Sequence, residues 1–211
     1  MAVVTLERAY YSAPFGDFFG ATDDELLGHL CRRSELDVEQ YQRNAWIAEF
    51  NLLRRHLFGF SGHILLEYAI PRMGRRADAV LLLPRFVVVL EFKVGQATYS
   101  PDGLDQVFDY ALDLKNFHEG SHEKWVVPIL VATEAPEQSS TFRRFEDGLF
   151  APARANAANL AAVLREAAIT SHEAPPVDVA AWLNAGYRPT PTIVEAAQAL
   201  YRGHNVVEIA R

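Results

Sequence analysis

Residues 63–93 read HILLEYAIPRMGRRADAVLLLPRFVVVLEFK, and this stretch decides the fold. It contains three runs of apolar and β-branched residues, at 63–70, 77–83 and 86–92. The linkers that separate these runs are short and contain PRMG and Pro84-Arg85. Short turns between runs of this length predict an antiparallel meander of three strands. Because the runs are apolar on both faces, we expect a sheet that is covered on both sides.

The segments on either side of the meander complete an α/β pattern. Residues 37–58 have the broad apolar face of a helix. A second helix is expected from Pro101 to about His118, followed by an apolar strand over Trp125–Ala132. A strand, a helix and another strand imply a parallel pairing with a right-handed connection. The fold class predicted is therefore α/β, with a mixed four-stranded sheet flanked by helices.

The flanks are mostly helical in character. Thr22 followed by Glu25 matches the capping box that begins a helix. A short strand is expected at Val3–Leu6. Further helices are expected at 152–168, 178–184 and 191–202. We divide the chain into an N-terminal extension (1–36), a core (37–150) and a helical C-terminal extension (151–211).

The composition excludes several classes of protein. With 211 residues, half of them hydrophobic, the chain can bury a core without disulfides. The single cysteine, Cys31, excludes an intrachain disulfide framework and fits a reducing compartment. The first residues lack the apolar stretch of a signal peptide, and no apolar run is long enough to span a membrane. We expect a cytoplasmic protein with no membrane partner.

The meander aligns three acidic residues. If Pro84-Arg85 is a two-residue turn, paired residue numbers in the second hairpin sum to 169, which places Asp78 opposite Glu91. If 71–74 form the first loop, the pairs sum to 145, which places Glu67 opposite Asp78. Three carboxylates then lie abreast on one face, about 5 Å apart at Cβ. Lys93, two residues beyond Glu91, is expected on the same face.

Clustered carboxylates in apolar strands need a compensating charge, because they repel each other and burial is costly. Oxygen ligands in a tight cluster suit Mg²⁺ or Mn²⁺. A hard cation beside a lysine is suited to phosphodiester hydrolysis, since the metal activates water and the lysine stabilises negative charge. For any one of these acids, an ordinary ion pair with a neighbouring Arg or Lys is the simpler interpretation. The whole set favours a metal site.

These residues resemble a known superfamily. Asp78, twelve residues and then Glu91-Phe92-Lys93 resemble the D…ExK signature of the PD-(D/E)XK nucleases. The expected order of elements resembles their restriction-endonuclease-like αβββαβ core. Gln106 and Tyr110, on one face of the next helix, resemble the QxxxY element of RecB-type members. The resemblance implies that Asp78 and Glu91 bind metal and that Lys93 assists the hydrolytic water.

Two further roles follow from the resemblance. The superfamily often takes another acid from its first helix or first strand, so Glu49 and Glu67 are the candidates, and the strand register favours Glu67. The QxxxY element, here Gln106 and Tyr110, faces the active site and the nucleic-acid backbone. Independently of the resemblance, Arg72, Arg75, Arg76 and Arg85 flank the sheet and are candidates to hold phosphates, and Arg75 or Arg76 could hold the acids, although arginines near hairpins are commonly just solvated.

A narrower resemblance is to the N-terminal nuclease-like domain of a bacterial family of predicted DNA/RNA helicases. It rests on LEYAIPRMGRRADAVLL, on VVVLEFK, and on the tail from 182 onwards. In that family a P-loop motor follows the domain, but these 211 residues contain no GxxxxGK[ST] sequence. The resemblance implies one domain of a helicase–nuclease that acts in DNA processing or repair, with DNA or RNA as the substrate and the motor as a partner.

Two other functions stay open. The domain could be a non-catalytic clamp that binds nucleic acid for a helicase. The run His118-Glu119-Gly120-Ser121-His122 matches the HExxH pattern of zinc metalloproteases. That chemistry needs both histidines one turn apart in a stable helix, whereas here a glycine and a serine separate them where a helix is expected to end.

The charge distribution limits how the chain can meet nucleic acid. The net charge is −7, which excludes a protein that coats the DNA backbone broadly. Residues 72–93, however, hold five basic and two acidic residues, a net charge of +3, so the rest of the chain carries −10. Contact is therefore expected at a small patch framed by arginines, with weak binding by this domain alone.

Overall fold

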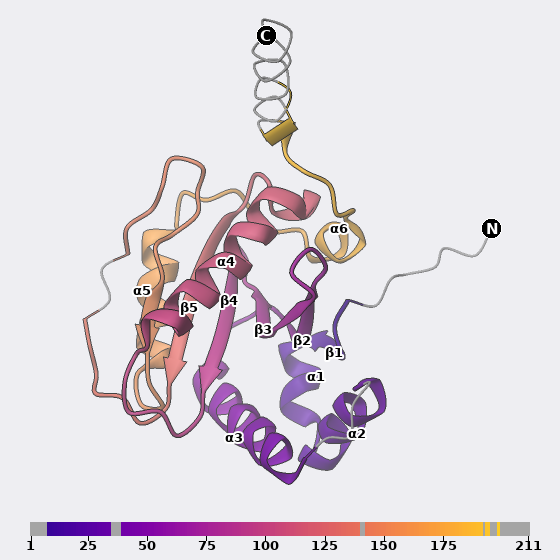
Figure 1. The fold of residues 1–211 in the computed structure, drawn as a ribbon, viewed down its shortest axis with the longest axis vertical. Helices are drawn as coiled ribbons and strands as arrows, with labels where there is room; N and C mark the ends of the chain where they lie inside the picture. Colours follow the sequence, from indigo (N-terminus) through magenta and orange to yellow (C-terminus); the bar gives the residue numbers. More distant parts are fainter. Residues whose placement is uncertain (1–7, 35–38, 140–141, 192, 195–197, 199–211) are drawn as a thin grey trace, which may run out of the picture.

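The computed structural model describes residues 8–34, 39–139, 142–191, 193–194 and 198 (Figure 1). Its strands form one mixed sheet of six strands in the order β1-β2-β3-β4-β5-β6. Strands β1 to β4 are antiparallel neighbours, and β4, β5 and β6 are parallel. The strands are β1 (Tyr11–Pro14), β2 (His63–Ile70), β3 (Arg75–Leu82), β4 (Phe86–Lys93), β5 (Trp125–Ala132) and β6 (Ala153–Ala155).

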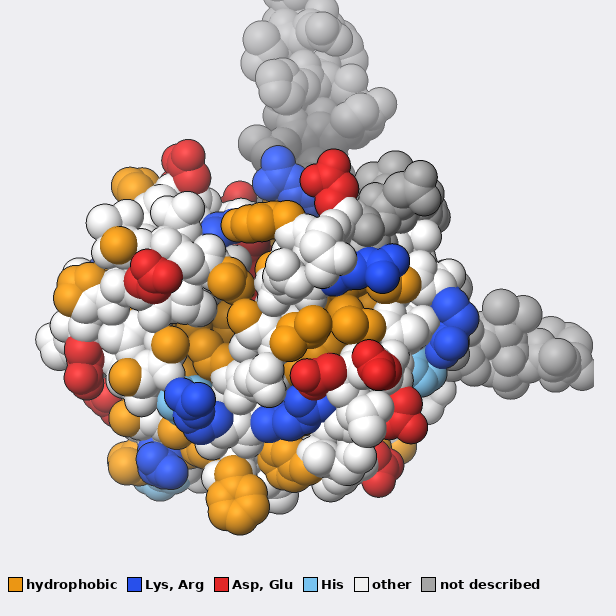
Figure 2. Space-filling model, turned by 90° about the horizontal axis from the view of Figure 1, so that it is seen from below, with side chains coloured by type: hydrophobic (Ala, Val, Ile, Leu, Met, Phe, Trp, Pro, Cys, Tyr) orange, Lys and Arg blue, Asp and Glu red, His pale blue; other side chains and the backbone are white. Residues whose placement is uncertain are grey.

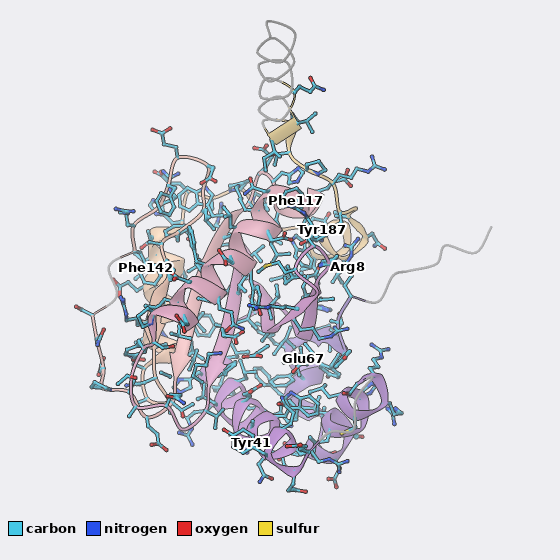
Figure 3. All side chains as sticks on the ribbon, in the orientation of Figure 1. Arg8, Tyr41, Glu67, Phe117, Phe142 and Tyr187 are labelled. Atoms are coloured by element: carbon cyan, nitrogen blue, oxygen red, sulfur yellow. The ribbon has the colours of Figure 1, made fainter. Side chains whose placement is uncertain are left out.

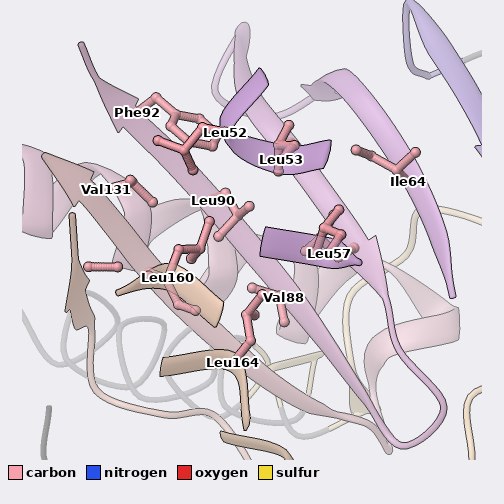
Figure 4. Close-up of a cluster of buried hydrophobic side chains, with 14 of the residues drawn as sticks. Leu52, Leu53, Leu57, Ile64, Val88, Leu90, Phe92, Val131, Leu160 and Leu164 are labelled. Carbon is pink, nitrogen blue, oxygen red and sulfur yellow. The ribbon is translucent and has the colours of Figure 1, made fainter. Parts of the chain in front are cut away.

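Helices cover both faces of this sheet, as the apolar strands predict. One face packs against α1, α2, α3 and α5, and the other packs against α4 and α6. Figure 4 shows the first of these cores, where leucines of α3 and α5 meet Val88, Leu90 and Phe92 of β4. The helices are α1 (Phe15–Gly20), α2 (Asp23–Arg33), α3 (Gln40–Leu57), α4 (Pro101–Phe117), α5 (Leu160–Thr170) and α6 (Val179–Asn184), with a 3-10 turn at Glu119–Ser121.

The predicted central elements are confirmed. Each expected strand and helix between residues 37 and 132 is present, with ends that differ by a few residues. The β4–β5 pair, joined through α4, is parallel. The capping box is also present, because the Thr22 side chain accepts from the Glu25 amide and the Glu25 side chain accepts from the Thr22 amide. Helix α6 confirms the helix expected at 178–184.

The sheet is wider than predicted, with six strands instead of four. The two additional strands, β1 and β6, lie at its two edges and contain four and three residues. Strands this short carry no readable periodicity, so their pairing depends on the sheet that they join. Helix α5 and the N-terminal helices α1 and α2 pack into the same core as α3.

The single helix expected over 152–168 is wrong. Ala153–Ala155 instead pair with β5, and helix α5 begins only at Leu160. Between them, the Asn156 side chain accepts from the amides of Ala158 and Asn159, and this turn separates the strand from the helix. Tertiary pairing thus overrides the high helix propensity of alanine.

Two predictions fall largely or wholly outside the described residues. These are the strand at Val3–Leu6 and most of the helix at 191–202. Among the residues described, no helix has the length and apolar character needed to cross a membrane.

Candidate active site

The β3–β4 hairpin opens at the point where its acidic residues lie. Its pairs run from Leu82↔Val87 to Ala79↔Leu90, which is the predicted register. The next pair would be Asp78 and Glu91, but the ladder ends before it. The Asp78 Oδ2 atom instead accepts from the Phe92 amide at 2.6 Å. The Asp78 carboxylate is therefore held at the opening between the two strands.

Glu67 interrupts the neighbouring β2–β3 ladder. Pairing stops at Leu66↔Ala79 and resumes at Tyr68↔Ala77 in the predicted register, so Glu67 and Asp78 form the omitted pair. Glu67 has a φ of 51°, a left-handed conformation that costs energy for a residue with a side chain. Its carbonyl oxygen accepts from the Arg76 guanidinium at 2.6 Å, and its Oε1 accepts from the Trp46 indole at 2.7 Å.

This interruption changes which face of the sheet the residues occupy. Leu66 and Ala79 belong to the core beneath α3, whereas Tyr68 and Ala77 belong to the core beneath α4. A regular strand would keep Leu66 and Tyr68 on the same face. The prediction that all three carboxylates share one face is therefore wrong: Glu67 bonds to Trp46 of α3, whereas Glu91 bonds to α4.

A hydrogen-bonded network joins β4 to α4. The Lys93 ammonium donates to Glu91 Oε1 at 2.9 Å and to Gln106 Oε1 at 3.1 Å. The Gln106 amide donates to Glu91 Oε1 at 2.7 Å and to the Tyr110 hydroxyl at 2.9 Å. Helix α4 presents Gln106 and Tyr110 one turn apart, and its N-terminus is capped by the Ser100 side chain. The second oxygen of Glu91, Oε2, is buried with no hydrogen-bond partner.

A fourth carboxylate, Glu49 of α3, lies beside the other three. It is buried, and burial followed by the negative charges of the other three acids raises its pKa well above the usual value. Burial and then repulsion from Glu91 also raise the pKa of Asp78 well above its usual value. The structure thus brings Glu49 and Glu67 close to the same cluster.

The pKa values of the other two acids, Glu67 and Glu91, are raised as well. Burial raises the pKa of Glu67, although the Trp46 hydrogen bond opposes this. Burial also raises the pKa of Glu91, against the effect of Lys93. A cluster in which every carboxyl has a raised pKa is short of positive charge.

A cavity of about 220 Å³ gives access to the cluster. Glu49, Asp78, Glu91 and Lys93 line it, and Tyr41 of α3 stands at its edge with 74% of its surface exposed. In Figure 3, Tyr41 lies on α3 at the end of the molecule opposite to Tyr187. The apolar helix face expected over 37–58 does not reveal the exposure of Tyr41, because that exposure depends on how α3 docks.

The cluster suits a divalent cation held by two carboxylates. Across the described part of the chain, no three His, Cys, Asp or Glu side chains converge as a complete metal-binding group. Mg²⁺, however, is commonly held by one or two carboxylates, with water and substrate phosphate completing its coordination. Asp78 and Glu91 fit that role, because Glu91 Oε2 lacks a partner and both pKa values are raised. Glu67, the third predicted ligand, is already bonded to Trp46.

The two predicted arginines have different surroundings. The Arg76 guanidinium carbon lies over the Tyr10 ring, 3.9 Å from its centre, and the guanidinium donates to the Glu67 carbonyl. Arg75 is exposed and lies close enough to Tyr110 to affect its ionisation. Both arginines also line a surface groove of about 710 Å³ beside the β2–β3 turn. Arg76 therefore supports the backbone at Glu67, and Arg75 remains available to a phosphate.

The residues that match HExxH do not have the arrangement of a zinc metalloprotease site. His118 ends α4, is fully buried and stacks on Trp182 with ring centres 4.0 Å apart. His122 bonds to the Arg188 carbonyl at 3.1 Å, and Glu119 accepts from the Gly186 amide at 2.9 Å. The segment between them is a 3-10 turn, so the histidines do not face one side of an α-helix as a zinc site of this type needs.

Comparisons with protein-family models, with curated proteins and with solved structures found no match to this chain.

Proposed function

We propose that this chain is a Mg²⁺- or Mn²⁺-dependent nuclease that hydrolyses phosphodiester bonds of DNA, with RNA as the second candidate substrate. The observation that carries the proposal is the convergence of Asp78, Glu91 and Lys93 at the open end of the β3–β4 hairpin. Gln106, which bridges Lys93 and Glu91, completes the arrangement. The two acids and the lysine come from adjacent strands, so they form a rigid site.

The order of elements supports a PD-(D/E)XK-like core. Helix α3 is followed by β2, β3 and β4, then by α4 and the parallel strand β5. This order is the αβββαβ arrangement that the resemblance implies, with β1 and β6 added at the edges. Within it, the acids lie where the central hairpin opens, and the QxxxY pair faces them from α4.

The side chains of the proposed site have different roles in the hydrolysis. Asp78 and Glu91 are the residues that would hold the cation, which supplies polarisation of the phosphate and a lower pKa of the attacking water. Lys93 is positioned to stabilise the negative charge that develops on the phosphate oxygens. Gln106 fixes the Lys93 ammonium and the Glu91 carboxylate in one geometry through its amide. Tyr110 orients Gln106 in turn.

The surface charge favours contact with a short stretch of substrate. Figure 2 views the molecule from the side of α2 and α3, where basic, acidic and apolar side chains are interspersed. Phosphate contacts supply most of the affinity of proteins for DNA, so few basic contacts mean weak binding. We therefore propose that a helicase motor, acting in DNA processing or repair, supplies most of the affinity.

The test is a cleavage assay on labelled single- and double-stranded DNA and on RNA, with Mg²⁺, with Mn²⁺ and with EDTA. We expect cleavage that requires the metal and is lost in Asp78→Asn and in Lys93→Ala. Gln138→Ala, a change at an exposed residue of the β5–β6 connection, is the matched control and should cleave normally. Absence of cleavage under both metals would refute the enzyme and favour the non-catalytic clamp. Cleavage that survives in Asp78→Asn would refute the site.

A further inference from the structure

Tyr41 lies at the edge of the cavity that leads to the carboxylate cluster. It belongs to the first turn of α3, and 74% of its surface is exposed. Its side chain makes no hydrogen bond or ring contact with the described residues, so the ring is open to a ligand. The proposed hydrolysis gives Tyr41 no role, although Asp78, Glu91 and Lys93 line the same cavity.

The face of α3 that carries this ring leaves room for a flat group. Tyr41, Ala45 and Glu49 follow one another at intervals of four residues, so they lie on one face of the helix. All three line the cavity. The methyl group of Ala45 takes up little space between the Tyr41 ring and the Glu49 carboxylate. A planar group can therefore lie against the ring while its substituents point towards the cluster.

The size of the cavity suits one unpaired base. Its volume of about 220 Å³ lies below the range typical of sites for drug-sized ligands. Bases in a duplex are stacked and paired, and a base must leave the stack at an energetic cost before a side chain can cover its face. A base in a single strand meets a much smaller cost, so the exposed ring favours a single strand.

Two side-chain amides flank this space. Gln42 follows Tyr41 on α3, and Gln96 lies just beyond β4; both line the cavity and are exposed. Neither side chain is hydrogen-bonded to a described residue. An amide group can both donate and accept, so it can bond to the polar edge of any base. The amides therefore support binding of a base without selecting a sequence.

We infer that Tyr41 is a specificity-determining residue, which stacks an unpaired base next to the phosphate held at Asp78, Glu91 and Lys93. This inference rests on the proposed function, because it takes the phosphate to lie at the carboxylate cluster. Aromatic side chains bind single strands by stacking, and they tolerate any sequence because every base has a π face. The site thus prefers a single-stranded segment to a duplex.

The experiment compares the binding of two ligands by the full chain in Ca²⁺, a hard cation that carboxylate oxygens also bind. One ligand is an unstructured single strand of DNA, and the other is a sugar–phosphate chain of equal length without bases. A gel verifies that both stay intact. We expect the wild type to bind the strand with bases about tenfold more tightly. Absence of this preference in the wild type would overturn the inference.

Two variants assign the preference to the ring. Tyr41→Ala should bind both ligands equally, whereas Tyr41→Phe, which keeps the ring, should retain the preference within about twofold. Because Tyr41 is exposed and alanine is a good helix former, the folded state of Tyr41→Ala should be as stable as that of the wild type. A preference that survives in Tyr41→Ala would overturn the inference.

Phe58→Ala is the matched control. Phe58 caps the other end of α3, is 78% exposed and is not among the residues that line the cavity. Its replacement should leave the preference for bases unchanged. A loss in Phe58→Ala as large as that in Tyr41→Ala would overturn the assignment to the cavity.

Cleavage separates a failure of this inference from a failure of the nuclease. In Mg²⁺, with the protein below saturation, Tyr41→Ala should cleave a single strand about tenfold more slowly than the wild type. It should cleave a blunt duplex at the rate of the wild type. Equal single-strand rates in two active proteins would overturn the inference and leave the nuclease standing. A chain that cleaves nothing but prefers bases only when Tyr41 is present would refute the nuclease and support base stacking.

Discussion

The open end of the β3–β4 hairpin and the segment from His118 to His122 both concentrate ionisable side chains, but they use them differently. At the hairpin, Lys93 and Gln106 bond to Glu91, which still has one unpartnered oxygen. In the His118–His122 segment, the side chains bond to backbone groups near residues 186–188 or stack on Trp182. The carboxylate cluster thus keeps one oxygen without a partner among the described residues, whereas the side chains of the His118–His122 segment hold the chain in place.

The largest expected effect comes from one isosteric change made in each region. Glu91→Gln should lower the rate of DNA cleavage in Mg²⁺ by about a thousandfold, because it removes a charge that the cation requires. Glu119→Gln should leave the rate within about twofold, because its side chain contacts the backbone of Gly186 and exposed Arg188. Single-turnover rates at saturating protein give the comparison, and an equal loss in both variants would contradict the division of roles.

The second effect is a pH dependence of stability that differs between the regions. Burial lowers the pKa of His118 to about 3, so the folded protein keeps this ring neutral. The buried neutral ring contributes its full stability above about pH 6.5, which is the pKa of histidine in the unfolded chain. This stability is lost as the pH falls towards 3. The stability of the wild type relative to His118→Phe, which keeps the stack on Trp182, should fall by about 2 kcal/mol between pH 6.5 and 4.5. Urea unfolding of both proteins at each pH measures this difference. If their free energies of unfolding changed with pH in parallel, the buried neutral ring would be refuted.

At the carboxylate cluster, stability depends on pH in the opposite direction. The pKa of Asp78 is raised, so the folded protein holds a proton that the unfolded chain releases. Without metal, stability from this group rises as the pH is lowered towards the unfolded value near 4, and Asp78→Asn should remove the share of that rise that Asp78 contributes. Saturating Mg²⁺ should also flatten it in the wild type. A dependence that is the same with and without Mg²⁺ would argue against a cation at this cluster.

The smallest effect concerns the strained residue. Glu67 has a φ of 51°, which glycine adopts without cost. Glu67→Gly should therefore be more stable than Glu67→Ala by about 1 kcal/mol, since both lose the carboxylate and its bond to Trp46 and only glycine relieves the backbone. Chemical unfolding in EDTA gives the difference. If Glu67→Ala proved the more stable of the two, the strain at this position would be disproved.

The register of the central hairpins could be predicted because it depends on local features. A two-residue turn at Pro84-Arg85 and a short loop at 71–74 determine which residues pair, and the observed pairs follow the predicted sums. The proximity of Asp78, Glu91 and Lys93 follows from the same arithmetic. The link from Lys93 to Gln106 could be expected only through the resemblance, because it joins a strand to a helix.

Other parts of the site depend on long-range packing or on backbone geometry. Glu49 and Tyr41 reach the cluster because α3 docks across the sheet, and no spacing in the sequence specifies that angle. The face that Glu67 occupies depends on its left-handed φ. A glutamate in the sequence does not predict this conformation, because it is uncommon for residues other than glycine. The edge strand β6 was missed because Ala153–Ala155 favour a helix until β5 offers them a partner.

Glu67 and Asp78 lie outside the β2–β3 ladder, so the ladder does not depend on them for its register. The ladder has the same register on both sides of this pair, because each strand contributes one residue that stays outside it. Deleting both residues would join the two halves of the ladder into one regular hairpin with every apolar side chain on its present face. Deleting either residue alone would shift one strand by a position and turn its side chains over. The sheet can thus keep its pattern without the acidic pair only if both residues are removed together.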